Sequence, residues 1–144
     1  MRTRVTAQDR IAGGWRGACN EAARMKQRRR APHPLEHHPS FRAVIAAAPP
    51  VADLARELAG DGRDLVATLA IVCGDLAHGF AAPPGSRQRN EAHHRAWITV
   101  REIDRTVTAA RIGRRAPARL LARAQRAIDR ADVMISALPG VVSA

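Results

Sequence analysis

Apolar residues recur every three or four positions in four stretches of the chain. The clearest pattern lies between Pro117 and Leu138, where one row of side chains is apolar at Leu121, Ala124, Ile128, Ala131, Ile135 and Leu138. At 3.6 residues per turn these positions share one face of a helix. The pattern predicts an amphipathic helix that buries this row against the rest of the protein.

The first apolar stretch begins after Ser40, a residue type that favours the N-cap of a helix. Its apolar positions are Phe41, Val44, Ile45, Ala48, Val51, Leu54, Ala55 and Leu58. Pro49 and Pro50 interrupt the stretch, and each proline disfavours a helical conformation in the residue before it. We therefore expect a helix that is broken or sharply kinked at the proline pair and that ends at the sequence Gly60-Asp61-Gly62.

Two further helices are expected between these stretches. The second helix carries Leu65, Leu69, Val72 and Leu76 at helical spacing, and Gly79 is a natural stop for it. A proline-rich turn follows, and Ser86 is a suitable N-cap for the third helix, which places His93, Val100, Ile103 and Val107 inward and ends near Gly113. The connection of residues 114–116 to the fourth helix is short, so the last two helices should pack antiparallel.

These elements predict an all-α protein, an antiparallel up-and-down four-helix bundle over residues 41–140. With 144 residues, 46% of them hydrophobic and 3% aromatic, the chain is long enough for one domain with a small aliphatic core. Residues 1–40 contain a glycine pair, three prolines and a run of basic residues, which indicates a basic, flexible tail. There is neither a signal-like stretch nor a run of 18 apolar residues, so we expect a cytoplasmic protein.

The formal net charge is +11, and 23 of the 24 basic residues are arginine. The charge is uneven: residues 1–42 and residues 83–144 each carry +7, whereas residues 43–82 carry −3. Because the planar guanidinium group donates two hydrogen bonds to one phosphate, an arginine surplus of this size favours an anionic partner. The acidic middle segment argues that the surplus marks a surface and not merely a uniform preference for arginine.

Four arginines form a row on the fourth helix, beside its apolar face. Arg119, Arg123, Arg126 and Arg130 fall within about 60° of one another on a helical wheel. The candidate nucleic-acid-binding set adds the arginines of the third helix and the following turn: Arg101, Arg105, Arg111, Arg114, Arg115, Arg119, Arg123, Arg126 and Arg130. Such residues would neutralise phosphates of RNA or DNA with little sequence preference and strong salt dependence.

Two alternatives to nucleic-acid binding remain at this stage. The arginines could pair with acidic residues of neighbouring subunits, the candidates being Asp53, Glu57, Asp61 and Asp64, in a purely structural assembly protein. Arg89 and His94 match the R-polar-x-x-x-H pattern of HEPN ribonucleases, in which histidine would move a proton and arginine would stabilise charge. His33, His37 and His38 have no fourth convergent ligand, so we expect no metal site, and no motif indicates a cofactor.

Residues 71–115 resemble a bacterial family of four-helix bundles. The similar features are the end of the second helix, the Gly- and Ser-containing turn, and two steps of the third helix: Asp75-Leu76-Ala77-His78-Gly79-Phe80, Pro84-Gly85-Ser86-Arg87, Glu102-Ile103 and Ile112-Gly113. They resemble proteins encoded in ribosomal-RNA intervening sequences and the accessory variability determinants of diversity-generating retroelements. The similarity extends over residues 41–138.

The resemblance implies a bundle that assembles into a homopentameric ring. In the retroelement branch it also implies a basic surface that binds nucleic acid and a reverse transcriptase, and it carries over no catalytic residues. The expected function is therefore that of a non-enzymatic, oligomeric accessory protein that binds RNA or DNA.

Overall fold

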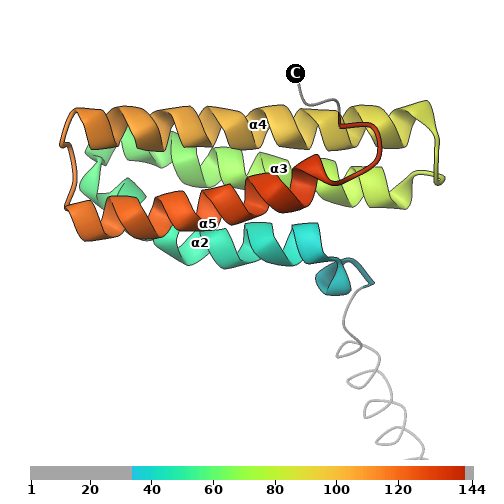
Figure 1. The fold of residues 1–144 in the computed structure, drawn as a ribbon, viewed down its shortest axis with the longest axis horizontal. Coiled ribbons are helices and arrows are strands. Elements are labelled where there is room, and N and C mark those ends of the chain that lie inside the picture. Colours follow the sequence, from blue (N-terminus) through green and yellow to red (C-terminus); the bar gives the residue numbers. More distant parts are fainter. Residues whose placement is uncertain (1–33, 142–144) are drawn as a thin grey trace, which may run out of the picture. The chain divides into compact units, whose positions relative to one another are not determined.

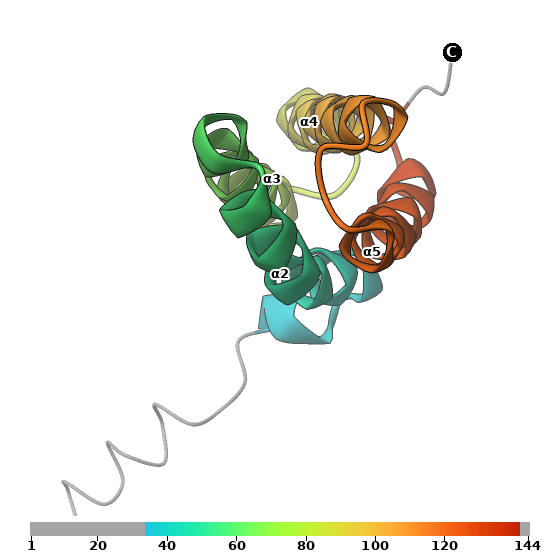
Figure 2. The same cartoon turned by 90° about the vertical axis from the view of Figure 1, so that its left-hand side faces the viewer.

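The computed structural model describes residues 34–141, and most of the tail predicted for residues 1–40 lies outside them. The elements in chain order are η1 (Pro34–His37), α2 (Pro39–Glu57), η2 (Ala59–Gly62), α3 (Arg63–Ala81), α4 (Arg87–Ile112) and α5 (Ala118–Ser136). Each α-helix runs antiparallel to the one before it (Figure 1). Helix α2 packs against α3 and α5, and α4 packs against the same two helices, so the four helices surround one core (Figure 2). The predicted all-α four-helix bundle is confirmed.

The core consists of aliphatic side chains from all four helices. The largest fully buried apolar residues are Leu54, Leu76, Ile103, Ile128 and Ile135. Every member of the apolar row predicted on the last helix is buried, from Leu121 to Leu138. Burial of one such Leu or Ile side chain stabilises the fold by about 1.5–3 kcal/mol, so this row alone attaches α5 firmly to the bundle.

Helix α2 differs from the prediction at both its start and its middle. It begins at Pro39 with His38 as the N-cap residue, whereas Ser40 lies inside the helix, buried and hydrogen-bonded to His38 Nδ1 at 2.8 Å. The helix also continues through Pro49 and Pro50 without a break. The two prolines remove hydrogen bonds to the carbonyls of Ile45 and Ala46, whose side chains are exposed, so water can solvate these carbonyls and the helix persists.

Helix α3 does not stop at Gly79 but runs to Ala81. Gly79 is buried, and a Cβ atom at this position would lie 2.5 Å from Cδ2 of the His93 ring on α4. The glycine is therefore needed for close packing of α3 on α4 and not for a helix end. At the start of α4 the prediction is confirmed, because Ser86 Oγ accepts a hydrogen bond from the Arg89 backbone amide at 3.2 Å.

Helix α3 also has an apolar outer surface. Val66 and Ile71 are 45% and 57% exposed. Among the described residues one segment, Asp64–Ala81, is long and apolar enough to cross a membrane by length and composition alone, although core helices of soluble proteins pass the same test. In this bundle the inner side of the segment packs against α2 and α4, and its outer side is left without a partner.

Candidate nucleic-acid interface

All nine candidate arginines lie on one half of the bundle, in α4, α5 and the turn between them, and all nine are exposed. Arg101 forms an ion pair with Asp132, and Arg123 forms one with Asp53. Within the described part of the chain, the side chains of six have no ion pair or hydrogen-bond partner: Arg105, Arg111, Arg114, Arg119, Arg126 and Arg130. This half of the molecule therefore presents guanidinium groups whose charge is not locally neutralised.

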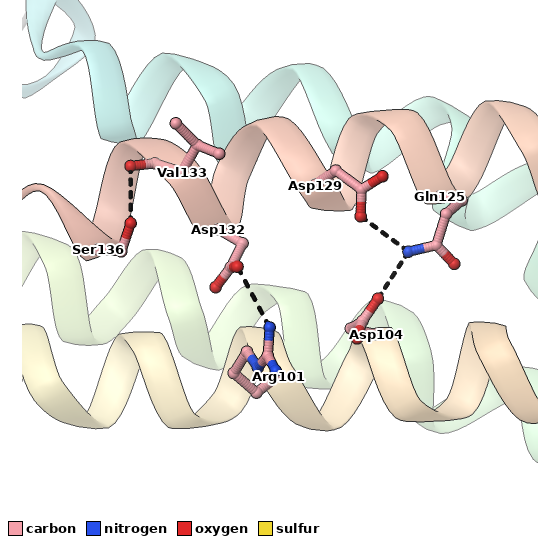
Figure 3. A network of polar contacts seen from close by, with 7 residues as sticks. All are labelled: Arg101, Asp104, Gln125, Asp129, Asp132, Val133 and Ser136. Carbon is pink, nitrogen blue, oxygen red and sulfur yellow. Dashed lines mark hydrogen bonds and ion pairs between the residues drawn. The ribbon is translucent and has the colours of Figure 1, made fainter. Parts of the chain in front are cut away.

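The row of four arginines on α5 and the carboxylates of that helix lie on different flanks. Asp129 and Asp132 face α4, where the Gln125 amide joins Asp129 to Asp104 and Arg101 contacts Asp132 at 3.4 Å (Figure 3). The other flank faces α2, where Arg123 Nη1 lies 3.6 Å from Asp53 Oδ2. The aspartates of this helix therefore do not neutralise the row.

Asp53, one of the carboxylates considered for pairing across subunits, already has partners within the chain. It forms ion pairs with Arg56 in the same helix and with Arg123 of α5. The side chains of both arginines are more than half exposed, and surface pairs of this kind contribute only about 0–1 kcal/mol. The pair between α2 and α5 therefore orients Arg123 more than it stabilises the bundle.

A pocket of about 600 Å³ opens where α4 ends and α5 begins. Three of the unpaired arginines, Arg111, Arg114 and Arg126, line it. The rest of its lining consists of one amide and four apolar residues: Gln125, Ala116, Ala118, Leu121 and Ala122. The lining of the pocket, which we call its rim where it is formed by arginine, thus combines three cationic side chains with a small apolar surface.

The backbone of the α4–α5 turn fixes the position of Arg114. Gly113 is the C-cap of α4, as predicted, but its φ is −75°, and the left-handed residue of the turn is Arg114 with φ +50°. The Arg115 amide donates to Ala110 O at 2.9 Å and the Arg114 amide to Arg111 O at 3.2 Å. These two bonds form the Schellman pattern, which usually places glycine at the left-handed position.

The start of α5 adds positive potential at the same place. Its N-cap residue is Pro117, no side chain of a described residue caps the first turn, and that turn contains no acidic residue. The first amide groups and the positive end of the helix dipole are therefore left to attract an anion near the pocket.

Sequence reasoning missed Gln125, which lies between the arginine row and the apolar row on α5. Its Nε2 atom donates to Asp104 Oδ1 at 2.6 Å and to Asp129 Oδ1 at 2.9 Å (Figure 3). Its Oε1 atom is excluded from solvent and has no hydrogen-bond partner among the described residues. The spacing of Gln125 and Asp129 by four positions was the available signal, but the contact with Asp104 depends on how α4 and α5 pack.

Arg89 and His94, the candidate ribonuclease pair, point to different surroundings. The Arg89 guanidinium lies over the Phe80 ring at 5.5 Å and faces Ala82 O. His94 stacks against Trp97 with ring centroids 5.8 Å apart, and it lines a separate pocket that Arg89 does not line. Five positions on a helix correspond to about 140° of rotation, which explains why the two side chains do not converge.

The histidines and cysteines of the described region form no metal site. No group of three or more His, Cys, Asp and Glu residues gathers in residues 34–141. His38 stacks on Phe80 at 4.0 Å, and burial lowers the pKa of its imidazole. Cys73 is half-buried against the core, where burial raises the pKa of its thiol, whereas Cys19 and His33 lie outside the described residues.

No protein-family model, no curated protein and no solved structure matches this chain. The resemblance to the intervening-sequence and retroelement proteins therefore stays a prediction made from the residues.

Proposed function

We propose that this protein is a non-enzymatic nucleic-acid-binding bundle that holds RNA or DNA by its phosphates on the α4–α5 half. The observation that carries the proposal is the group of six exposed arginines without a partner among the described residues, all on these two helices and their turn. Their guanidinium groups would displace counterions from a polyanion, which gives affinity without sequence readout.

The test neutralises part of the arginine row and leaves the fold intact. In the triple variant Arg119→Gln, Arg126→Gln and Arg130→Gln, no recorded ion pair is lost, because Arg123 keeps its contact with Asp53. Binding to a fixed duplex DNA and to a single-stranded RNA is measured by fluorescence anisotropy over a series of salt concentrations. We expect at least tenfold weaker binding, and a plot of log K against log salt that is shallower by about two to three units, because about one unit is lost per phosphate contact.

The matched control removes three positive charges elsewhere. Arg42→Gln, Arg87→Gln and Arg95→Gln change the net charge equally but lie outside the nine candidate arginines, on α2 and in the first half of α4. Arg87 and Arg95 give up exposed ion pairs with Glu91 and Asp75, which contribute little to stability. This control should keep most of the affinity and the salt slope. Equal losses in both variants would mean that net charge alone drives binding, and unchanged binding in the first variant would refute the proposed interface.

The proposal extends, through the family resemblance, to a cytoplasmic accessory role beside a reverse transcriptase and to self-association. Val66 and Ile71 are exposed on α3. A second copy of the chain that covered this helix would remove them from water, which supports self-association. The neighbouring genes test the accessory role: a reverse transcriptase gene with a template repeat supports it, whereas a position inside a ribosomal-RNA gene supports the other branch of the family.

A further inference from the structure

We propose that the pocket between α4 and α5 receives one unpaired base of a single-stranded nucleic acid. The inference rests on the proposed function, because the arginines at its rim belong to the same phosphate-binding surface. With such a pocket, the surface would bind a strand that carries unstacked bases more tightly than a bare sugar-phosphate backbone.

The lining of the pocket suits a nucleotide better than a phosphate alone. Arg111, Arg114 and Arg126 supply the cations that a phosphate needs, but Ala118, Leu121 and Ala122 offer it nothing. A planar base gains from contact with these methyl groups because its faces are poorly hydrated. The volume of about 600 Å³ lies within the range of pockets that hold small molecules and is ample for one nucleoside.

Gln125 supplies a hydrogen-bond acceptor in a fixed orientation. Two carboxylates, Asp104 and Asp129, both accept from its Nε2 atom, so the amide cannot turn over without facing oxygen with oxygen. Its Oε1 atom points away from both aspartates (Figure 3) and has no partner among the described residues. An N–H donor that reached this atom would satisfy a polar group that is now buried without a hydrogen bond.

Every nucleic-acid base carries such a donor on its Watson–Crick edge. In a duplex the Watson–Crick donors are engaged, and the amino hydrogens that remain lie inside a groove, so an unpaired base is the form that can enter the pocket and donate to Gln125. Oε1 is excluded from solvent, so a base reaches it only when a neighbouring side chain moves aside. The three arginines that line the pocket are exposed, and their side chains hold no ion pair within residues 34–141 that would oppose such a movement. The arrangement therefore favours single strands and accepts any of the four bases.

The experiment compares three ligands of equal length: a single-stranded oligonucleotide, the same strand with every base replaced by an abasic site, and the duplex. Affinity is measured by fluorescence anisotropy at one salt concentration for the wild-type chain and for Ala122→Leu, which adds bulk to the apolar lining of the pocket and keeps every charge. Ala109→Leu is the matched control, because Ala109 is exposed on α4 and does not line the pocket.

We expect the wild-type chain to bind the single strand about tenfold more tightly than the abasic strand, a difference of the size that one hydrogen bond and one buried base provide. Ala122→Leu should abolish this preference while its affinity for the abasic strand stays unchanged, and Ala109→Leu should behave as wild type. If the wild-type chain binds both strands equally, or if Ala122→Leu keeps the preference, the base pocket is refuted although phosphate binding stands. If none of the three ligands binds, the proposed function itself fails.

A free nucleotide is the other source of the same chemistry. Titration with a nucleoside 5′-monophosphate as a competitor distinguishes the two sources. Displacement only at concentrations far above those of the oligonucleotide supports a strand as the ligand. If the wild-type protein binds the monophosphate saturably but does not bind the oligonucleotide, the inference is overturned.

Discussion

Arg114 adopts a backbone conformation that residues with a side chain rarely adopt. Its φ of +50° places it in the left-handed region, which costs roughly 1–2 kcal/mol for an L-residue, and glycine avoids that cost. A glycine stands next to it at Gly113, in an ordinary helical conformation. The chain therefore keeps an arginine where stability favours glycine, and this arginine lines the cationic pocket.

Arg114→Gly should consequently stabilise the bundle and weaken nucleic-acid binding. We expect a gain of about 1 kcal/mol in the free energy of unfolding, reduced somewhat by the greater freedom of glycine in the unfolded chain. Urea denaturation measures the gain, and anisotropy measures the loss of binding. Arg115→Gly serves as the control because Arg115 is not left-handed, so it should bring no gain in stability. Equal gains in both variants would contradict the assignment of strain to position 114.

His93 is the buried residue whose charge state matters most to the fold. It is completely buried, its Nδ1–H donates to Pro139 O at 3.2 Å, and its Nε2 atom faces Gly79 without a hydrogen-bond partner among the described residues. Burial, assisted by the positive charge of Arg89, lowers the pKa of His93 below its ordinary value of 6.5, although the bond to Pro139 opposes this shift. The neutral imidazole is thus the form that the fold accommodates.

The bundle should therefore lose stability as the pH falls below about 6.5. Because the folded-state pKa of His93 is the lower one, the unfolded chain takes up the proton first, and stability falls from pH 6.5 down to the folded-state pKa. Thermal unfolding at pH 7.5 and pH 5.0 should show a lower midpoint in acid. His93→Gln should lessen this difference, while His38→Gln, which removes the other histidine with a lowered pKa, measures the remainder. A wild-type midpoint that does not change with pH would contradict the argument.

At the level of the helices, α2 has the local sequence that is least favourable for helix formation. Pro49 and Pro50 stand in its interior and leave two carbonyls without their usual partners. The helix survives because its inner face, with Val44, Val51 and Leu54 fully buried, gains more from packing on α3 and α5 than the prolines lose.

Pro49→Ala should therefore stabilise the protein. Proline is about 3 kcal/mol less favourable than alanine inside a helix, and the more flexible unfolded chain of the variant offsets about 0.4–1 kcal/mol of this. We expect a net gain of about 1–3 kcal/mol in urea denaturation. Nucleic-acid affinity should not change, because Pro49 carries no charge and belongs to α2, outside the helices that carry the candidate arginines. A loss of stability would mean that the proline ring itself makes a packing contact worth more than the restored hydrogen bond.

The sequence predicted the helices well because their apolar rows are regular and few residues interrupt them. It failed where tertiary packing overrides a local preference: at Ser40, which is buried within a helix; at the two prolines of α2; and at Gly79, whose lack of a side chain admits His93. At the candidate site the exposed arginines followed from helical spacing, whereas the pocket and the role of Gln125 depend on how two helices dock. Such docking is not encoded in the periodicity of either helix alone.

At the scale of the whole molecule, the unpaired arginines and the exposed residues of α3 belong to different helices. The unpaired arginines occupy α4, α5 and the turn between them, whereas Val66 and Ile71 are exposed on α3; Ile112 of α4 and Val133 of α5 are exposed apolar residues beside the arginines. The two surfaces can thus serve different partners, nucleic acid on one and a further copy of the chain on the other.

Self-association through α3 should be insensitive to salt and sensitive to a charge on that helix. Sedimentation or light scattering should show one assembly mass at low and high salt, because apolar contacts are not screened. Ile71→Glu should reduce this mass, while Val133→Glu on α5, where Val133 is 61% exposed, should leave it unchanged. A wild-type monomer would refute the self-association, and dissociation of the wild-type assembly by salt would favour arginine pairing between subunits instead.

The described chain enters and leaves the bundle at one end, and the cationic pocket lies at the other. Pro34 precedes the start of α2, and Gly140 packs against Asn90 at the start of α4, whereas the pocket adjoins the end of α4 (Figure 1). The 26 residues of α4 separate the two ends by about 39 Å at 1.5 Å per residue. A tether attached just before Pro34 or just after Val141 would therefore hold the protein on a sensor surface with its arginine pocket facing the solution.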